Sequence, residues 1–328
     1  MSPDVKSTAD LFLRNATLLY RELPHTNHAV RLFGAGLYSA RGKTVNLIEA
    51  ERCMKQLKSE YSVVSPLRGT VTDTAALVMA ASDTPKLLFE RAKQFYFHLE
   101  KGLSGSPYMM LVALYFVSFT EKERYRDVAE RVLGLYRHMQ DKHPITTSVR
   151  DVMSAALLTG CLSSSNSWLA LDESEHNLRF LKKAFGSRDT TRALAMLMAC
   201  SAKNAKDKCE RVVRIYEEFR AAGIRYGRRG ELTMLGMLSF LDDTPKNLAN
   251  ELVELSLYLK ENKEFSRVSL ARLSMYAAFL LAVCKRKNHD QSLLSQSLFL
   301  RSTLALILQQ SMLTAEATPI YATMLFGR

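Results

Sequence analysis

The amino-acid sequence predicts an all-α protein, and three observations favour this fold class. The 328 residues contain only 14 Gly and 8 Pro, too few turn formers for a fold of many short strands. Runs in which Val, Ile or Thr alternate with polar residues are scarce. Apolar residues instead recur with helical spacing in windows about 40 residues apart. We therefore expect six to seven antiparallel helical hairpins, stacked as an α-solenoid or closed into a toroid.

Near the N-terminus, a short glycine-containing stretch invites comparison with a phosphate-binding loop. That loop needs four residues between its glycines and a strand before them. Here Gly36 and Gly42 enclose five residues, and the preceding segment has a helical pattern. We therefore expect a helix that ends near Ala40, a turn at Gly42, and a next helix opened by Thr44 or Asn46.

Two distant stretches, 83–86 and 243–246, share the sequence Asp-Thr-Pro-Lys. Asp or Thr caps the free N–H groups of a starting helix, and Pro is tolerated at the first helical position because that N–H has no partner there. Each stretch is therefore expected to begin a helix.

Five windows of nine residues share one pattern of apolar residues, and two of these windows follow the Asp-Thr-Pro-Lys stretches. Each has an apolar residue at its fifth and ninth positions, and three have Tyr at the sixth. Successive windows start roughly 40 residues apart, at Arg91, Arg131, His176, Arg211 and Glu251. A second, more apolar helix precedes each window, at 74–82, 111–119, 153–161, 192–200 and 233–241. One amphipathic hairpin cannot cover its apolar face alone, so stacked hairpins are expected.

The whole chain, 1–328, is expected to form a single helical-repeat domain. Residues 1–70 would supply N-terminal helices, including a hairpin of 28–40 with 47–61. Residues 71–272 would hold the core repeats, and 273–328 the C-terminal capping helices.

Composition predicts a cytoplasmic protein that does not insert into membranes. A hydrophobic fraction of 47% and a charged fraction of 24% are typical of globular proteins. The segment from Met1 to Leu19 lacks the uninterrupted apolar run of a signal peptide, and no apolar run is long enough to span a bilayer. The five Cys are scattered without a Cys-x-x-Cys pair, which favours buried thiols in a reducing compartment over disulfides or zinc.

Three segments, 59–69, 225–261 and 272–283, follow an order that resembles an uncharacterised bacterial family, domain of unknown function 4003. The resemblance covers about residues 25 to 285 and is most specific at 225–261. It implies a bacterial cytosolic helical protein. Because that family has no established activity, the resemblance assigns no functional residues.

No catalytic, cofactor or metal motif is expected. His25 and His28 supply two ligands, half of a metal site. His98 shares its window position with residues of other chemistry, which is typical of an exposed helix face. The acidic stretch 171–176 is expected to cap a following helix, and Trp168 to lie in the loop before it.

The function favoured by this architecture is a non-enzymatic binding or scaffold protein that holds a peptide or protein in its groove. Tyr96, Tyr136 and Tyr216, at the sixth window position, are the candidate contacts if they face the groove. The same three residues could equally belong to the core.

A second class is binding of nucleic acid or another anionic ligand. Residues 179–229 carry 14 Lys and Arg against 5 Asp and Glu. The densest basic piece holds Arg225, Tyr226, Arg228 and Arg229, a combination suited to phosphates and base stacking. A solvated basic helix face gives the same pattern. A third class, an enzyme on a helical toroid, would assemble its carboxylates from several loops.

Overall fold

A computed structural model describes residues 1–60, 70–103, 108–144, 147, 151–161, 167–187, 189–200, 204–223, 232–266 and 268–289. The described residues form fourteen α-helices and short 3-10 turns, and they contain no strand. The predicted all-α class is therefore confirmed. Within the same residues, no helix is long and apolar enough to cross a membrane.

The helices group into two compact units. Among the described residues, unit 2 comprises 18–38 and 44–163, and unit 1 comprises 1–17, 39–43 and those from 164 onward. The single domain expected from the sequence for the whole chain stays a prediction.

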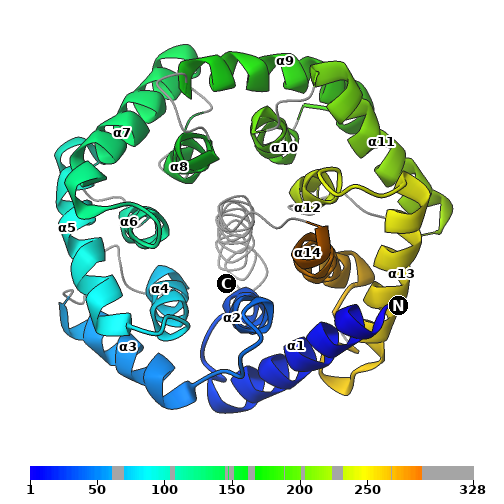
Figure 1. Ribbon diagram of the computed structural model, residues 1–328, viewed down its shortest axis with the longest axis horizontal. Helices are drawn as coiled ribbons and strands as arrows, with labels where there is room; N and C mark the ends of the chain where they lie inside the picture. The colour runs from blue at the N-terminus through cyan, green and yellow to red at the C-terminus, as the bar shows by residue number, and fades with distance from the viewer. Residues whose placement is uncertain are drawn as a thin grey trace, which may run out of the picture. The chain divides into compact units, whose positions relative to one another are not determined.

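Unit 2 has two layers of helices (Figure 1). In one layer the amphipathic helices α5 and α7 lie side by side, and in the other α4, α6 and α8 follow one another. The helices of this unit, with α2 ending just beyond it, are α2 (His28–Ala40), α3 (Leu47–Glu60), α4 (Thr70–Ala80), α5 (Pro85–Leu103), α6 (Met109–Val117), α7 (Tyr125–Lys142) and α8 (Val152–Cys161).

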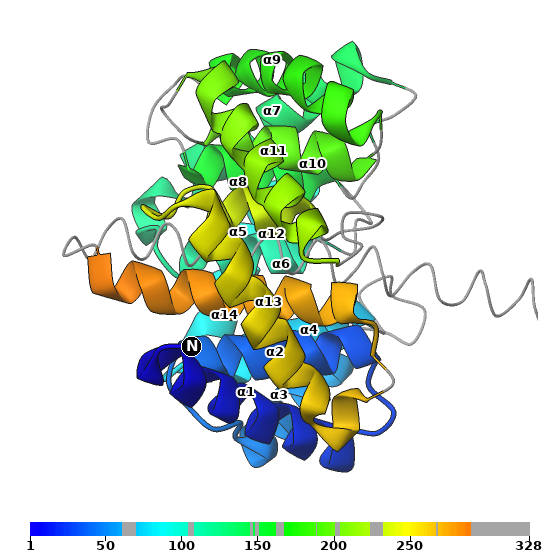
Figure 2. The same cartoon turned by 90° about the vertical axis from the view of Figure 1, so that its right-hand side faces the viewer.

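Unit 1 repeats this layering. Helices α9, α11 and α13 pack in sequence in one layer, and α10, α12 and α14 pack in sequence in the other (Figures 1 and 2). Its helices are α9 (Ser167–Phe185), α10 (Asp189–Ala199), α11 (Ala205–Ala221), α12 (Leu232–Leu238), α13 (Pro245–Glu261) and α14 (Leu270–His289), with most of α1 (Pro3–Glu22).

Most amphipathic helices form a hairpin with the apolar helix that follows them in the chain. The pairs α3–α4, α5–α6, α7–α8, α9–α10 and α13–α14 pack extensively. The expected hairpin of 28–40 with 47–61 is therefore wrong in its pairing, because α3 packs mainly on α4. Apolar and amphipathic helices alternate along the chain, so the sequence pattern alone allowed either neighbour as partner.

The expected helix starts and turns are confirmed. Pro85 and Pro245 are the first residues of α5 and α13, and Thr244 Oγ1 accepts a hydrogen bond from the Asn247 N–H at 3.2 Å. Gly42 follows α2 with φ of 67°, a left-handed conformation that Gly adopts without strain. Asn46 caps α3, since its side-chain oxygen accepts a hydrogen bond from the N–H of the third helical residue at 3.1 Å.

The window pattern matches the buried residues in four of its five copies. The fifth and ninth positions after Arg91, Arg131, Arg211 and Glu251 are all buried: Phe95, Leu99, Leu135, Met139, Ile215, Phe219, Leu255 and Leu259.

The window placed at His176 is in the wrong register. Its expected core residues, Phe180 and Ala184, are half-buried and exposed, whereas Asn177 and Leu181 are buried. Counting from residue 173 restores the pattern, with Asn177 at the fifth position. The Asn177 amide donates to the Ala195 carbonyl at 3.3 Å, so a polar residue occupies a core position and hides the apolar spacing.

Two of the window-starting arginines bind the turn that follows the next helix in the chain. Arg91 of α5 donates to the Thr120 carbonyl at 2.8 Å, just beyond α6. Arg211 of α11 donates to the carbonyls of Ser239 at 2.9 Å and Leu241 at 2.7 Å, just beyond α12. These carbonyls lie in the turn that follows α6 or α12, so each guanidinium ties that turn to its own amphipathic helix.

The loop before α13 is also held by an ion-pair cluster in unit 1. Lys285 Nζ lies 2.6 Å from Asp243 Oδ2 and 3.0 Å from Glu251 Oε2. Partial burial alone would raise the pKa of Asp243, but hydrogen bonds from Lys285, Asn247 and the Thr244 N–H lower it below its ordinary value. Burial would lower the pKa of Lys285, yet the two carboxylates raise it above its ordinary value.

We expect the Asp243–Lys285 pair to make the free energy of unfolding depend on pH in the acidic range. Because the folded-state pKa of Asp243 is lowered, its contribution is present above about pH 4 and is lost as pH falls through the folded pKa. Urea unfolding at pH 7 and pH 3 should therefore show a smaller loss of stability for Asp243→Asn than for the wild type. Asp242→Asn, which alters a neighbouring exposed carboxylate, is the control and should keep the wild-type loss.

Candidate binding site

The α5 and α7 helices of unit 2 carry a hollowed surface. Helix α5 turns Phe89, Phe95 and Leu99 into the core. Residues three and four apart on a helix share a face, so Phe97 and Lys101 lie next to one another on the opposite side. Phe97 is 57% exposed, an unusual setting for a large aromatic side chain.

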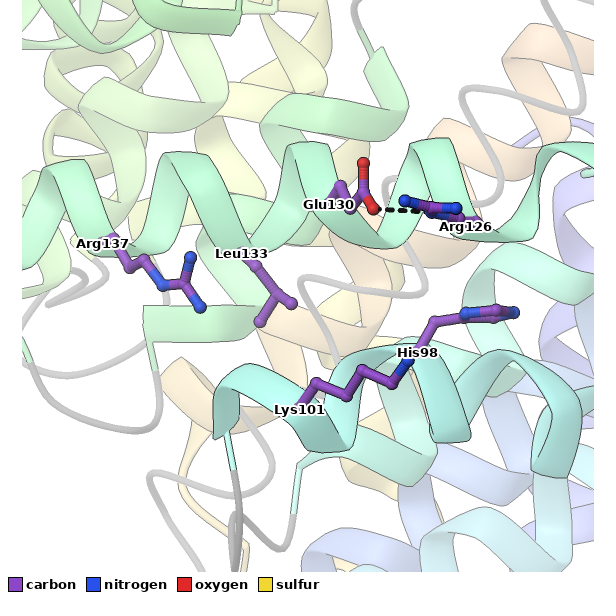
Figure 3. A pocket seen from close by; sticks show the side chains of 6 residues that line it. All are labelled: His98, Lys101, Arg126, Glu130, Leu133 and Arg137. Carbon is purple, nitrogen blue, oxygen red and sulfur yellow. Dashed lines mark hydrogen bonds and ion pairs between the residues drawn. The ribbon is translucent and has the colours of Figure 1, made fainter.

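The first hollow, named here the cationic pocket, lies between α5 and α7 and has a volume of about 500 Å³. Figure 3 shows its side chains, two from α5 and four at helical spacing along α7. They are His98, Lys101, Arg126, Glu130, Leu133 and Arg137.

Positive charge exceeds negative charge in this pocket. Glu130 accepts a hydrogen bond from Arg126 Nε at 2.8 Å (Figure 3). That bond, followed by the Arg126 charge and the charges of His98 and Lys101, lowers the pKa of Glu130. Glu130 therefore stays ionised and balances Arg126. Among the described residues no carboxylate forms an ion pair with Lys101 or Arg137, so two cations face the pocket in excess.

The absence of a side chain at Gly102 leaves space for the Arg137 guanidinium. A Cβ at residue 102 would lie 2.9 Å from Arg137 Nη2 and 2.9 Å from Leu133 Cδ2, closer than real Cβ contacts come. The missing side chain on α5 thus admits the guanidinium between the helices.

The second hollow, the aromatic pocket, adjoins the first and has a volume of about 630 Å³. His98 lines both pockets. Lys101 Nζ of the cationic pocket also lies 5.1 Å from the ring centroid of Phe97, which lines the aromatic one. The lining residues are Glu90, Lys93, Gln94, Phe97, His98, Lys122 and Tyr125.

The floor of the aromatic pocket is rigidly held. Tyr125 is 1% exposed, and its hydroxyl accepts a hydrogen bond from Arg91 Nε at 2.7 Å. Its ring meets Phe95 edge to face at 5.4 Å between centroids. A preformed floor beneath an exposed aromatic side chain suits the binding of an apolar group without rearrangement.

The three predicted tyrosine contacts do not line either pocket. Tyr136 is buried, and its hydroxyl accepts from the Gln140 side chain at 3.1 Å. Tyr216 is half-buried against Phe185, with ring centroids 5.0 Å apart. Tyr96 is half-buried, and burial is the main cause that raises its pKa. Packing therefore accounts for Tyr136, while partner contact stays a prediction for the other two.

The predicted anion-binding residues Arg225, Tyr226, Arg228 and Arg229 lie outside the described residues. Within the rest of 179–229, two cations are used internally. Lys208 is 2% exposed and pairs with Glu173 at 2.7 Å, and Arg211 binds carbonyls.

Two smaller expectations for the region around α9 are wrong. Trp168 and Asp172 lie inside α9, which begins at Ser167, so Trp168 is not in a loop and Asp172 does not cap the helix.

His98, expected from its window position to lie on an exposed helix face, lines both pockets. A usable signal was Phe97, an aromatic residue on the otherwise polar face of its helix. Arg126, Glu130 and Arg137 carried none, because charged residues at helical spacing are common on solvated faces.

No group of three or more potential metal ligands comes together within the part of the chain that the structure describes. Cys53 and Cys209 are buried, and burial is the largest cause that raises their pKa values, to about 12 and about 11. Both remain thiols at neutral pH, so neither has the character of a nucleophile.

Comparison with known proteins gives one match. A family model described as "Protein of unknown function (DUF4003)" matches residues 18–312. No curated protein and no solved structure matches the chain.

Proposed function

The chain belongs to the DUF4003 family of proteins of unknown function, and we propose that it is a helical-repeat binding protein whose α5–α7 surface docks a segment of a protein partner. The observation that carries the proposal is the pair of adjoining pockets beside Phe97. A large exposed aromatic side chain lowers solubility. Contact with a partner would bury its apolar surface and so stabilise the complex.

The repeat interpretation has support from helix spacing. Successive amphipathic helices start roughly 40 residues apart, at 47, 85, 125, 167, 205 and 245. The shared burial pattern and the equivalent contacts of Arg91 and Arg211 with the turn after the next helix support the same interpretation. Arrays of this kind present extended surfaces to which partners bind without catalysis.

An enzymatic role has weaker support at this surface. A general acid needs a raised pKa, whereas Arg126 lowers that of Glu130. Nucleic-acid binding through Arg225, Tyr226, Arg228 and Arg229 stays a prediction, to be tested by salt titration of oligonucleotide binding.

Affinity capture tests the docking proposal. We expect the immobilised full chain to retain a defined protein from a bacterial lysate, and Phe97→Ser to lose at least about nine-tenths of it, because removal of a central aromatic contact costs about 2 kcal/mol. Ile48→Ser is the matched control, since Ile48 is an 84% exposed apolar residue of α3 in the same unit. Equal recovery by the wild type and Phe97→Ser, or no specific recovery, would contradict the proposal.

A further inference from the structure

The cationic pocket and the aromatic pocket together define the chemistry of the partner segment. We infer that the segment is acidic, with carboxylates placed against Arg137 and Lys101 and an apolar side chain placed against Phe97. This inference rests on the proposed function, since it names the partner that the α5–α7 surface would dock.

The charge of the cationic pocket favours an acidic segment. Lys101 of α5 and Arg137 of α7 face the cationic pocket in excess of the Arg126–Glu130 pair, so an incoming acidic segment would meet unbalanced positive charge from both helices (Figure 3). A guanidinium presents a planar pair of donors that matches a carboxylate, and the Gly102 gap fixes where that guanidinium lies.

The aromatic pocket favours an apolar side chain in the same segment. Phe97 is exposed on one side and Tyr125 is buried beneath, so the hollow offers aromatic surface to an apolar side chain of modest size. Lys93 lies 2.9 Å from Glu90 at the rim, which leaves this pocket more nearly balanced in charge than the first. The two pockets therefore favour different side chains.

The spacing of the two groups follows from α5. The α5 residues of the two pockets are centred roughly five residues apart, which is roughly 8 Å along a helix axis. An extended chain covers that distance in two to three residues at roughly 3.3 Å each. The segment should thus carry its apolar residue two or three positions from an acidic residue.

Fluorescence anisotropy with labelled peptides tests this inference on the full chain. The probe is Gly-Leu-Gly-Glu-Glu-Gly, with Gly-Gly-Gly-Glu-Glu-Gly and Gly-Leu-Gly-Lys-Lys-Gly as comparison peptides. We expect the first to bind more tightly than the second and the third not to bind. Salt should weaken binding, because part of the affinity is electrostatic.

Three variants locate the binding. Arg137→Ala should weaken the acidic peptide about tenfold, whereas Lys182→Ala, which removes one exposed cation of unit 1, should leave it unchanged. Gly102→Ala should also weaken it about tenfold without any change in net charge, because the new methyl group collides with both Arg137 and Leu133 of the cationic pocket. Gly102→Ala raises helix propensity, so loss of folding is not expected.

The outcomes separate the inference from the proposed function. Binding of the lysine peptide, absence of acidic-peptide binding, or an equal effect of Arg137→Ala and Lys182→Ala overturns the inference. If Phe97-dependent capture of a protein persists in that case, the docking surface stands and only the assigned chemistry is wrong.

Discussion

Phe12→Ala is expected to lower the free energy of unfolding by about 3 to 5 kcal/mol, the largest effect among the substitutions considered. Phe12 is fully buried on α1 within unit 1, with its ring centroid 6.0 Å from that of Phe265 and 5.7 Å from that of Tyr276, both stacked. The substitution removes the phenyl ring and leaves a cavity between α1 and α14. Alanine is a good helix former, so the loss reports packing and not helix propensity.

The position of Phe12 matters because it joins the start of the chain to residues near the end of the described part. The same helix is linked to α13 by the hydrogen bond from the Tyr258 hydroxyl to Asp10 and by the ion pair of the N-terminal amine with Glu254 at 2.7 Å. These are exposed or half-exposed polar contacts of small net value. The aromatic stack should therefore dominate the attachment of α1.

Urea unfolding followed by circular dichroism measures the Phe12 effect, with Arg14→Ala as the control. Arg14 is exposed on the same helix and should change stability by less than about 0.5 kcal/mol. A loss below about 1 kcal/mol for Phe12→Ala would contradict the packing described for α1. The Phe12→Ala/Phe265→Ala double mutant should lose less than the sum of the single mutants, because the two rings contact one another.

The helices could be predicted from the sequence because apolar residues recur along it with helical spacing. Proline at the first helical position and Gly after the last turn placed the starts of α5 and α13 and the end of α2 correctly. Apolar residues at the fifth and ninth window positions identified buried residues wherever the core position was apolar. At Asn177 the core position is polar, and the window there was placed three residues too late.

The candidate site was harder to predict, since nearly all its residues come from α5 and α7, two helices that are not consecutive in the chain. Which helices lie side by side depends on tertiary packing, and the alternation of apolar and amphipathic helices did not reveal it. The gap that Gly102 leaves for Arg137 depends on a contact between α5 and α7, so nothing in the local sequence distinguishes it from an ordinary helix glycine. Tyr136 at the sixth window position illustrates the converse, because the periodicity that made it a candidate contact also places residues in the core.

Arg211→Ala is expected to lower the free energy of unfolding by about 3 kcal/mol. Its guanidinium donates to three main-chain carbonyls, those of Ser239 at 2.9 Å, Leu241 at 2.7 Å and Asp243. Hydrogen bonds to a charged donor contribute roughly 1.5 to 3 kcal/mol each at most, and water can replace some of them because Arg211 is only partly buried. A total of about 3 kcal/mol is thus a conservative expectation.

The chemistry of the side chain sharpens the Arg211 test. Arg211→Lys keeps the charge but replaces a planar fork by one ammonium group, which cannot reach carbonyls from both Ser239 and Leu241 with the same geometry. We expect Lys to recover less than half of the loss. Arg214→Ala, on the exposed face of α11 and 3.7 Å from Glu210, should cost less than about 0.5 kcal/mol. Full recovery by Lys would mean that charge alone stabilises the loop after α12, and would contradict a role for the planar set of carbonyl hydrogen bonds.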